Sequence, residues 1–94
     1  MSYDLEFKKS ALKEWQKLGS TLQQQFKKKL AERLTNPHIP AAKLSGGDNL
    51  YKIKLKQSGY RLVYQVQDKS IIVTVIAVGK RERSDVYLKA IKRL

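Results

Sequence analysis

The 94-residue sequence contains no cysteine and a single histidine, His38. Without cysteine the chain has no disulfide bridge, no thiolate metal site and no cysteine nucleophile. One histidine excludes a ribonuclease mechanism that uses two. No cluster of acidic or histidine residues has metal-ligand spacing, and no glycine-rich phosphate loop is present, so we expect neither a metal nor a cofactor.

Long apolar runs are also missing. The longest covers residues 71–78, far less than the roughly 20 residues of a membrane-spanning helix. It is apolar on both faces, which is typical of a central strand covered by helix on at least one side. The first residues show no basic region followed by an apolar run, as a secretion signal would. We therefore expect a cytoplasmic protein without a membrane partner.

Acidic residues are scarce relative to basic ones. The chain has 8 aspartates and glutamates against 20 lysines and arginines, a formal net charge of +12. Such a surplus predicts binding to nucleic acid that weakens as salt is added. An acidic partner protein would neutralise it too. Charge alone does not separate an RNA binder, a DNA binder and a structural protein of the ribosome.

The apolar pattern predicts a single α+β domain over residues 1–94, with the element order β-α-α-β-β-β-α. A first helix ends at Gly19, and a capping box of Ser20 and Gln23 opens the second. We expect these helices to form an antiparallel hairpin that packs on a largely antiparallel sheet.

Residues 50–66, "LYKIKLKQSGYRLVYQV", predict a two-stranded hairpin. One face of its first strand carries three basic residues: Lys52, Lys54 and Lys56. A two-residue loop at Ser58 and Gly59 would set Lys56 opposite Arg61 and keep Arg61 on the lysine face. This lysine face could bind a polyanion, or it could be only a solvated surface.

A second basic segment, "GKRERSDVY", follows the central strand. Lys80, Arg81 and Arg83 precede Tyr87, which lies about one turn beyond a Ser84 helix cap. Arginine suits phosphate, and a tyrosine ring can stack on a base or a sugar. Alternatively, Tyr87 belongs only to the apolar stripe of the last helix.

Lysines also cover the predicted helical hairpin. Those at positions 27–29 point in different directions around a helix, so we expect a diffuse basic surface and no common pocket. With the loop and strand cations, the expected RNA- or ribosome-binding residues are Lys13, Lys17, Lys27, Lys28, Lys43, Lys56, Lys80 and Arg83.

Three segments together, "ALKEWQKLGS", "YKIKLKQSGYRLVYQV" and "VGKRERSDVY", resemble the RelE-type toxins of bacterial type II toxin–antitoxin pairs. The resemblance covers essentially the whole chain. It implies a microbial-ribonuclease-like fold and cleavage of mRNA in the A site of the 70S ribosome. It also implies an acidic RelB-like antitoxin, through which the complex would bind operator DNA. The family's working residues carry over to Lys52, Lys54, Arg61, Arg81 and Tyr87.

One departure from the family is visible. Relatives often have a basic residue in the loop before the hairpin, where this chain has Ser45, with Lys43 nearby. The difference concerns contacts of that loop with the substrate or the ribosome, and not the chemistry.

Metal-free RNA cleavage requires the 2′-hydroxyl to attack the adjacent phosphate, which leaves a 2′,3′-cyclic phosphate and a 5′-hydroxyl. Arginine stays protonated, so Arg61 and Arg81 are assigned to charge stabilisation. Lys54 is the candidate acid, and Lys52 a candidate base or second electrostatic group. Tyr87 would stack on the nucleotide or assist the attacking hydroxyl. Such a site should be weak on RNA that the ribosome does not hold in place.

Three other interpretations stay open. They are a ParE-like toxin that shares the fold but inhibits DNA gyrase, a non-catalytic RNA- or ribosome-binding protein, and an inactive toxin that retains only antitoxin binding. A gyrase inhibitor has no need for the five working residues, which argues against the first. If the chain is a toxin, we expect its antitoxin to displace the short terminal helix and move Tyr87.

Overall fold

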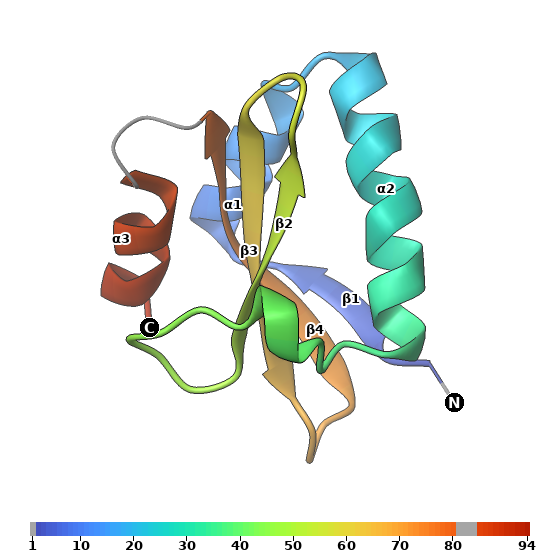
Figure 1. Cartoon of the computed structure of the whole chain (residues 1–94), viewed down its shortest axis with the longest axis vertical. Coiled ribbons are helices and arrows are strands. Elements are labelled where there is room, and N and C mark those ends of the chain that lie inside the picture. Colours follow the sequence, from blue (N-terminus) through green and yellow to red (C-terminus); the bar gives the residue numbers. More distant parts are fainter. Residues whose placement is uncertain (1, 81–84) are drawn as a thin grey trace.

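The computed structural model describes residues 2–80 and 85–94 of the chain, and Figure 1 shows how its elements are arranged. In chain order they are β1 (Asp4–Phe7), α1 (Lys9–Gln16), α2 (Ser20–Thr35), a short 3-10 helix (Pro40–Ala42), β2 (Leu50–Leu55), β3 (Tyr60–Gln67), β4 (Ile72–Lys80) and α3 (Asp85–Lys92). The predicted element order and the α+β class are confirmed. Within the described residues, no helix is both long and apolar enough to cross a membrane.

The strands form one mixed sheet in the order β1-β4-β3-β2. The neighbours β2 and β3 pair antiparallel, as do β3 and β4. By contrast, β1 runs parallel to β4, from Asp4 opposite Ile72 to Phe7 opposite Val75. β4 is thus central, as predicted, but β1 pairs with its outer edge only as far as Val75.

Each face of the sheet has its own core, because β4 is apolar on both faces. On one face, Trp15 of α1 and Phe26 of α2 are buried together with alternate residues of the strands. On the other face, Val86 and Ala90 of α3 pack on a second group that includes Val63 of β3. Figure 1 shows α2 and α3 on opposite sides of the sheet.

A β-bulge supplies part of the second core. Val63 pairs with Ala77 and Tyr64 with Val75, which leaves Ile76 as an extra residue on β4. A bulge interrupts the alternation of side chains, and Ile76 and Ala77 accordingly both belong to the core beneath α3. Burial of an aliphatic side chain of this size stabilises by about 1.5–3 kcal/mol. The bulge therefore adds apolar surface on which α3 packs.

The turn between β2 and β3 is longer than predicted. It comprises residues 56–59, and Lys54 pairs with Arg61. The predicted register, with Lys56 opposite Arg61, is wrong by two residues. Gly59 closes the turn with a φ of +77°, a conformation that glycine adopts without strain. Because the shift is even, Arg61 still shares a face with the lysines, as predicted.

The start of α2 also differs from the prediction. Gly19 is the N-cap residue, Ser20 is already helical, and no side chain caps the helix. The predicted capping box is therefore wrong. The side-chain amide of Gln23 donates instead to the carbonyl of Trp15 at 2.9 Å, which ties the end of α1 to α2. The rings of Trp15 and Phe26, 6.2 Å apart, pack beneath this connection.

Candidate functional site

The β2–β3 hairpin gathers three basic side chains beside α3. Lys54 pairs directly with Arg61, and Lys52 lies two residues earlier on the same strand face. Lys54 is exposed, whereas Lys52 and Arg61 are half-buried. Val63, opposite Lys52, is fully buried in the core beneath α3. The basic residues therefore lie where the hairpin emerges from under the helix.

Tyr87 of α3 completes this group. Arg61 Nη1 donates a hydrogen bond to the Tyr87 hydroxyl at 2.8 Å, and the guanidinium carbon lies 5.2 Å from the centre of the ring. Lys52 Nζ lies 5.6 Å from the same centre. Cations at such distances are attracted to the face of an aromatic ring. We call Lys52, Lys54, Arg61 and Tyr87 the cationic cluster.

The cluster combines both properties that the sequence suggested for Tyr87. Its ring packs against the core beneath α3, as a residue of an apolar stripe would. Its hydroxyl is held at the same time by a residue of the lysine face. Three elements, β2, β3 and α3, thus converge on one aromatic ring.

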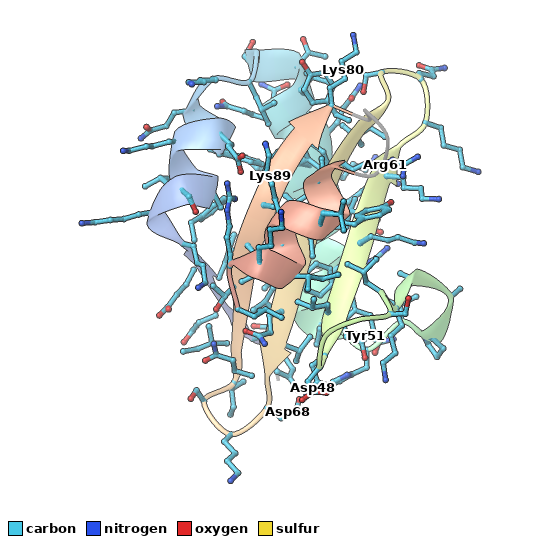
Figure 2. All side chains as sticks on the ribbon, turned by 90° about the vertical axis from the view of Figure 1, so that its left-hand side faces the viewer. Asp48, Tyr51, Arg61, Asp68, Lys80 and Lys89 are labelled. Atoms are coloured by element: carbon cyan, nitrogen blue, oxygen red, sulfur yellow. The ribbon has the colours of Figure 1, made fainter. Side chains whose placement is uncertain are left out.

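The cluster lies toward one end of the sheet. Figure 2 shows Arg61 and Lys80 near that end and the acidic residues Asp48 and Asp68 near the other. Lys80 is the exposed last residue of β4 and pairs with Tyr60. Arg81 and Arg83, both predicted site residues, lie outside the described residues. This distribution of charge makes the cluster end attractive to anions.

The arrangement suits a phosphodiester of a nucleic acid. A guanidinium offers paired donors to phosphate oxygens, an ammonium group adds a point charge, and a tyrosine ring can stack on a base. Within the described residues, no group of three or more histidine, aspartate and glutamate residues could hold a metal ion. The side chains of the cluster can stabilise negative charge and transfer protons.

A groove adjoins the cluster between α2 and the β2–β3 turn. It has a volume of about 860 Å³, and its basic lining residues are Lys28, Lys29, Lys54 and Lys56. The lining includes Lys28 and Lys29 but not Lys27, so two of the three consecutive lysines share one groove where the sequence predicted a diffuse basic surface. Adjacent residues are about 100° apart around a helix, so both can border one groove.

The other predicted binding lysines are not part of the described lining of this groove. Lys13 lies on α1, Lys17 directly follows α1, and Lys27 lies on α2. Lys43 pairs with Tyr51 through an isolated bridge, and Figure 2 shows Tyr51 well away from Arg61. A role for these four residues in binding stays a prediction.

An acidic residue that the sequence analysis did not single out anchors α3. Glu14 of α1 accepts hydrogen bonds from Arg93 at 2.9 and 3.2 Å, from Lys89 at 3.3 Å and from the backbone N–H of Val78 at 3.1 Å. Burial raises the pKa of Glu14, but the bonds from Arg93 and Val78, with the charge of Arg93, outweigh it and hold that pKa below its ordinary value. We call Glu14, Lys89 and Arg93 the α3 anchor.

A second polar network joins loops at the other end of the sheet and accounts for the single histidine. His38 Nδ1 lies 2.8 Å from the Tyr51 hydroxyl, and Nε2 lies 2.8 Å from Asp68. Tyr3 donates to the same carboxylate at 2.7 Å. The bonds from His38 and Tyr3 lower the pKa of Asp68. His38 thus connects the segment before β2 to the β3–β4 turn.

Comparison with known proteins identifies the family to which this fold belongs. Residues 5–85 match the family described as ParE toxin of type II toxin-antitoxin system, parDE. Over 94 residues the chain is 61% identical to the mRNA interferase toxin RelE of Escherichia coli strain K12, and the match covers 100% of this chain and 99% of that protein. The chain belongs to the RelE/ParE family of type II toxins.

Solved RelE structures share the architecture described above. The R81A/R83A variant of E. coli toxin RelE in the free state is 58% identical, with a TM-score of 0.92 over 100% of this chain and 99% of that chain. In the intact E. coli RelBE toxin–antitoxin complex, the match is 60% identical, with a TM-score of 0.84 over 87% of this chain and 100% of that chain. The RelE fold that the resemblance implied is confirmed.

Proposed function

We propose that this chain is the toxin of a toxin–antitoxin pair and that it inhibits translation by cleaving mRNA in the ribosomal A site. The observation that carries the proposal is the convergence of Lys52 and Arg61 on Tyr87, with Lys54 opposite Arg61. The similarity of the whole chain to a protein named mRNA interferase toxin supports RNA cleavage as the reaction class.

In the proposed reaction, the ribose 2′-hydroxyl loses its proton and its oxygen attacks the adjacent phosphorus. The bond from phosphorus to the 5′-oxygen breaks as that oxygen takes up a proton, which leaves a 2′,3′-cyclic phosphate and a 5′-hydroxyl. Lys54 donates this proton, and Lys52 accepts the first one or adds positive charge. Arg61, together with Arg81, stabilises the negative charge that develops on the phosphate oxygens.

Tyr87 orients the nucleotide by stacking on its base. The hydrogen bond from Arg61 fixes the ring beside the two strands. The same bond occupies one guanidinium nitrogen, so a bound phosphate shares Arg61 with the tyrosine hydroxyl. Substrate binding and the position of Tyr87 are therefore coupled through Arg61.

The proposed site depends on an external scaffold. Catalysts built from lysine and arginine gain most when the reacting groups are already held in line, and the 70S ribosome presents a codon in that way. We accordingly place the protein in the cytoplasm, as one domain that needs no cofactor or membrane partner. An acidic RelB-like antitoxin would neutralise it, and the complex would bind operator DNA through the antitoxin.

Cleavage of one mRNA, with and without programmed ribosomes, tests this function. We expect the wild type to cut only on ribosomes and to leave a cyclic phosphate, and Lys54→Ala to lose the activity. Lys69→Ala is the matched control, because Lys69 is an exposed lysine in the turn between β3 and β4.

Three results would overturn the proposal. Equal cutting of free mRNA would remove the ribosome from the mechanism. Tight, salt-dependent RNA binding without cutting would leave a binding protein or an inactive toxin. Inhibition of DNA gyrase in place of cutting would assign the ParE-like activity.

A further inference from the structure

The groove beside the cationic cluster has features that the cleavage reaction does not use. Its walls are α2, which contributes Lys28 and Lys29, and the β2–β3 turn, which contributes Lys56. All three lysines are exposed, so their ammonium groups can reach a bound ligand. The proposed reaction does not use these ammonium groups, because it places Arg61 at the reacting phosphate and Tyr87 against the base.

The lining combines charge with groups that suit nucleotide bases. Among the charged residues that line the groove, four are lysines and one, Glu32, is acidic. Two leucines, Leu22 and Leu55, add apolar surface, and amide and hydroxyl groups come from Thr21, Gln25, Gln57 and Ser58. Lysines bind the phosphates of a nucleic acid whatever its sequence, while amides and hydroxyls can donate hydrogen bonds to base edges and accept them. The groove therefore suits a single strand whose phosphates contact the lysines and whose bases contact the polar and apolar lining.

The groove is continuous with the cluster. A second hollow of about 290 Å³ shares Lys54, Leu55 and Lys56 with it and extends to Gly59, Tyr60 and Arg61. Arg61 in turn holds the hydroxyl of Tyr87. A basic path thus leads from Tyr87 across the hairpin to α2.

We propose that this groove binds the single-stranded segment of mRNA that flanks the cleaved phosphodiester. The proposal rests on the proposed function, because it takes the cationic cluster as the site of cleavage. An acidic antitoxin segment would also be attracted by the lysines. The shared residues Lys54 and Lys56 favour the substrate strand, because a strand bound at Arg61 must leave the cluster through an adjoining surface.

Binding of two oligonucleotides tests this inference without ribosomes. Both contain a 2′-deoxy nucleotide at the cleaved position, which cannot attack, and their lengths are about three and about nine nucleotides. The wild type should bind the longer one at least about tenfold more tightly. Lys28→Gln combined with Lys29→Gln should abolish most of this gain and reduce the slope of log K against log salt by about 1.4, as expected for two lost phosphate contacts.

The control is Lys9→Gln combined with Lys69→Gln, which removes the same charge from exposed positions on α1 and the β3–β4 turn. This control variant should still bind the longer oligonucleotide more tightly than the shorter one, as the wild type does. Urea unfolding of both double variants checks that they fold alike.

Three outcomes would overturn the inference. In the first, the groove variant binds both oligonucleotides as the control does. In the second, only its cleavage on ribosomes falls, which assigns the groove to ribosomal RNA. In the third, only its affinity for an acidic antitoxin peptide falls. A wild type that binds through Lys28 and Lys29 but cuts nothing on ribosomes would contradict the proposed function and leave the groove as a binding site for single-stranded RNA alone.

Discussion

Arg93, which directly follows α3, pairs with Glu14 of α1 through both terminal guanidinium nitrogens, at 2.9 and 3.2 Å. Their side chains are 23% and 20% exposed, so water screens this pair less than a surface ion pair. Arg93 also donates to the Ile76 carbonyl at 2.8 Å, and its own carbonyl accepts a bond from Lys8 at 2.6 Å. The helix that carries Tyr87 is therefore fixed at its far end by charge.

Glu14→Gln should loosen α3. A neutral amide has one accepting oxygen in place of two and so cannot form the bidentate ion pair with Arg93, and a lost hydrogen bond to a charged group costs about 1.5–3 kcal/mol. Hydrogen exchange should show faster exchange of the α3 amides with little change in β3, and cleavage should fall because Tyr87 is positioned less often. Glu6→Gln, at an exposed position of β1, is the control. Equal protection of α3 in both variants would contradict the anchoring role.

Acid should release α3 before the rest of the chain unfolds. The folded pKa of Glu14 lies below its ordinary value, mainly because Arg93 and Val78 outweigh the opposing effect of burial. Its stabilising contribution is therefore complete above the ordinary pKa of about 4.3 and is lost as the pH falls through the folded pKa.

The protection factors of the α3 amides, which correct the exchange rates for slower intrinsic exchange at low pH, should accordingly fall from about pH 6 to about pH 3 in the wild type and much less in Glu14→Gln. The pKa of Asp68 is also lowered. The comparison is therefore made in an Asp68→Asn background, where that carboxyl no longer titrates. Identical pH profiles with and without Glu14 would show that another group controls the helix.

The ring and the hydroxyl of Tyr87 should be separable. Tyr87→Phe keeps the ring near Lys52 and Arg61 but removes the hydrogen bond from Arg61. If that bond contributes about 1.4 kcal/mol to the transition state, cleavage on ribosomes falls about tenfold. Tyr87→Ala should reduce it much further, because stacking is lost too. Equal loss in both variants would assign the whole effect to the hydroxyl.

Gly59→Ala should strain the β2–β3 turn. The φ of Gly59 is +77°, and no atom lies within 4 Å of an added Cβ, so the cost is purely conformational. We expect roughly 1–2 kcal/mol from urea unfolding. Gly59→Asn should cost less, since asparagine tolerates this region better. Equal destabilisation by both would mean that the turn has another conformation in solution.

Alternation along the hairpin was enough to place Arg61 on the lysine face. Which face of a strand is buried depends only on whether a register shift is odd or even, and the apolar residues Tyr51, Ile53 and Leu55 determine that parity. The number of turn residues is a different matter. Ser58 and Gly59 predicted a two-residue loop, and the backbone uses four residues to close it.

The α3 anchor could not be predicted from local patterns. Glu14 and Arg93 are 79 positions apart, and their pairing depends on how α1 and α3 approach the same edge of β4. The only sequence signal is one glutamate in an otherwise lysine-rich first helix. Lys29 was not predicted as a binding residue for a related reason. The groove that it lines is formed by α2 and by a turn far away in the sequence, and no periodic pattern reveals such a contact.

Two side chains cover the outer edge of β4 beyond the end of β1. The pairing of β1 with β4 ends at Val75. Beyond Val75, the backbone N–H of Val78 donates to Glu14, and Arg93 donates to the carbonyl of Ile76. Two side chains thus occupy backbone groups that would otherwise be available to a strand of another molecule. The same pair that holds α3 protects the sheet from edge-to-edge association, so chains that have lost the pair should also be the ones most prone to aggregate.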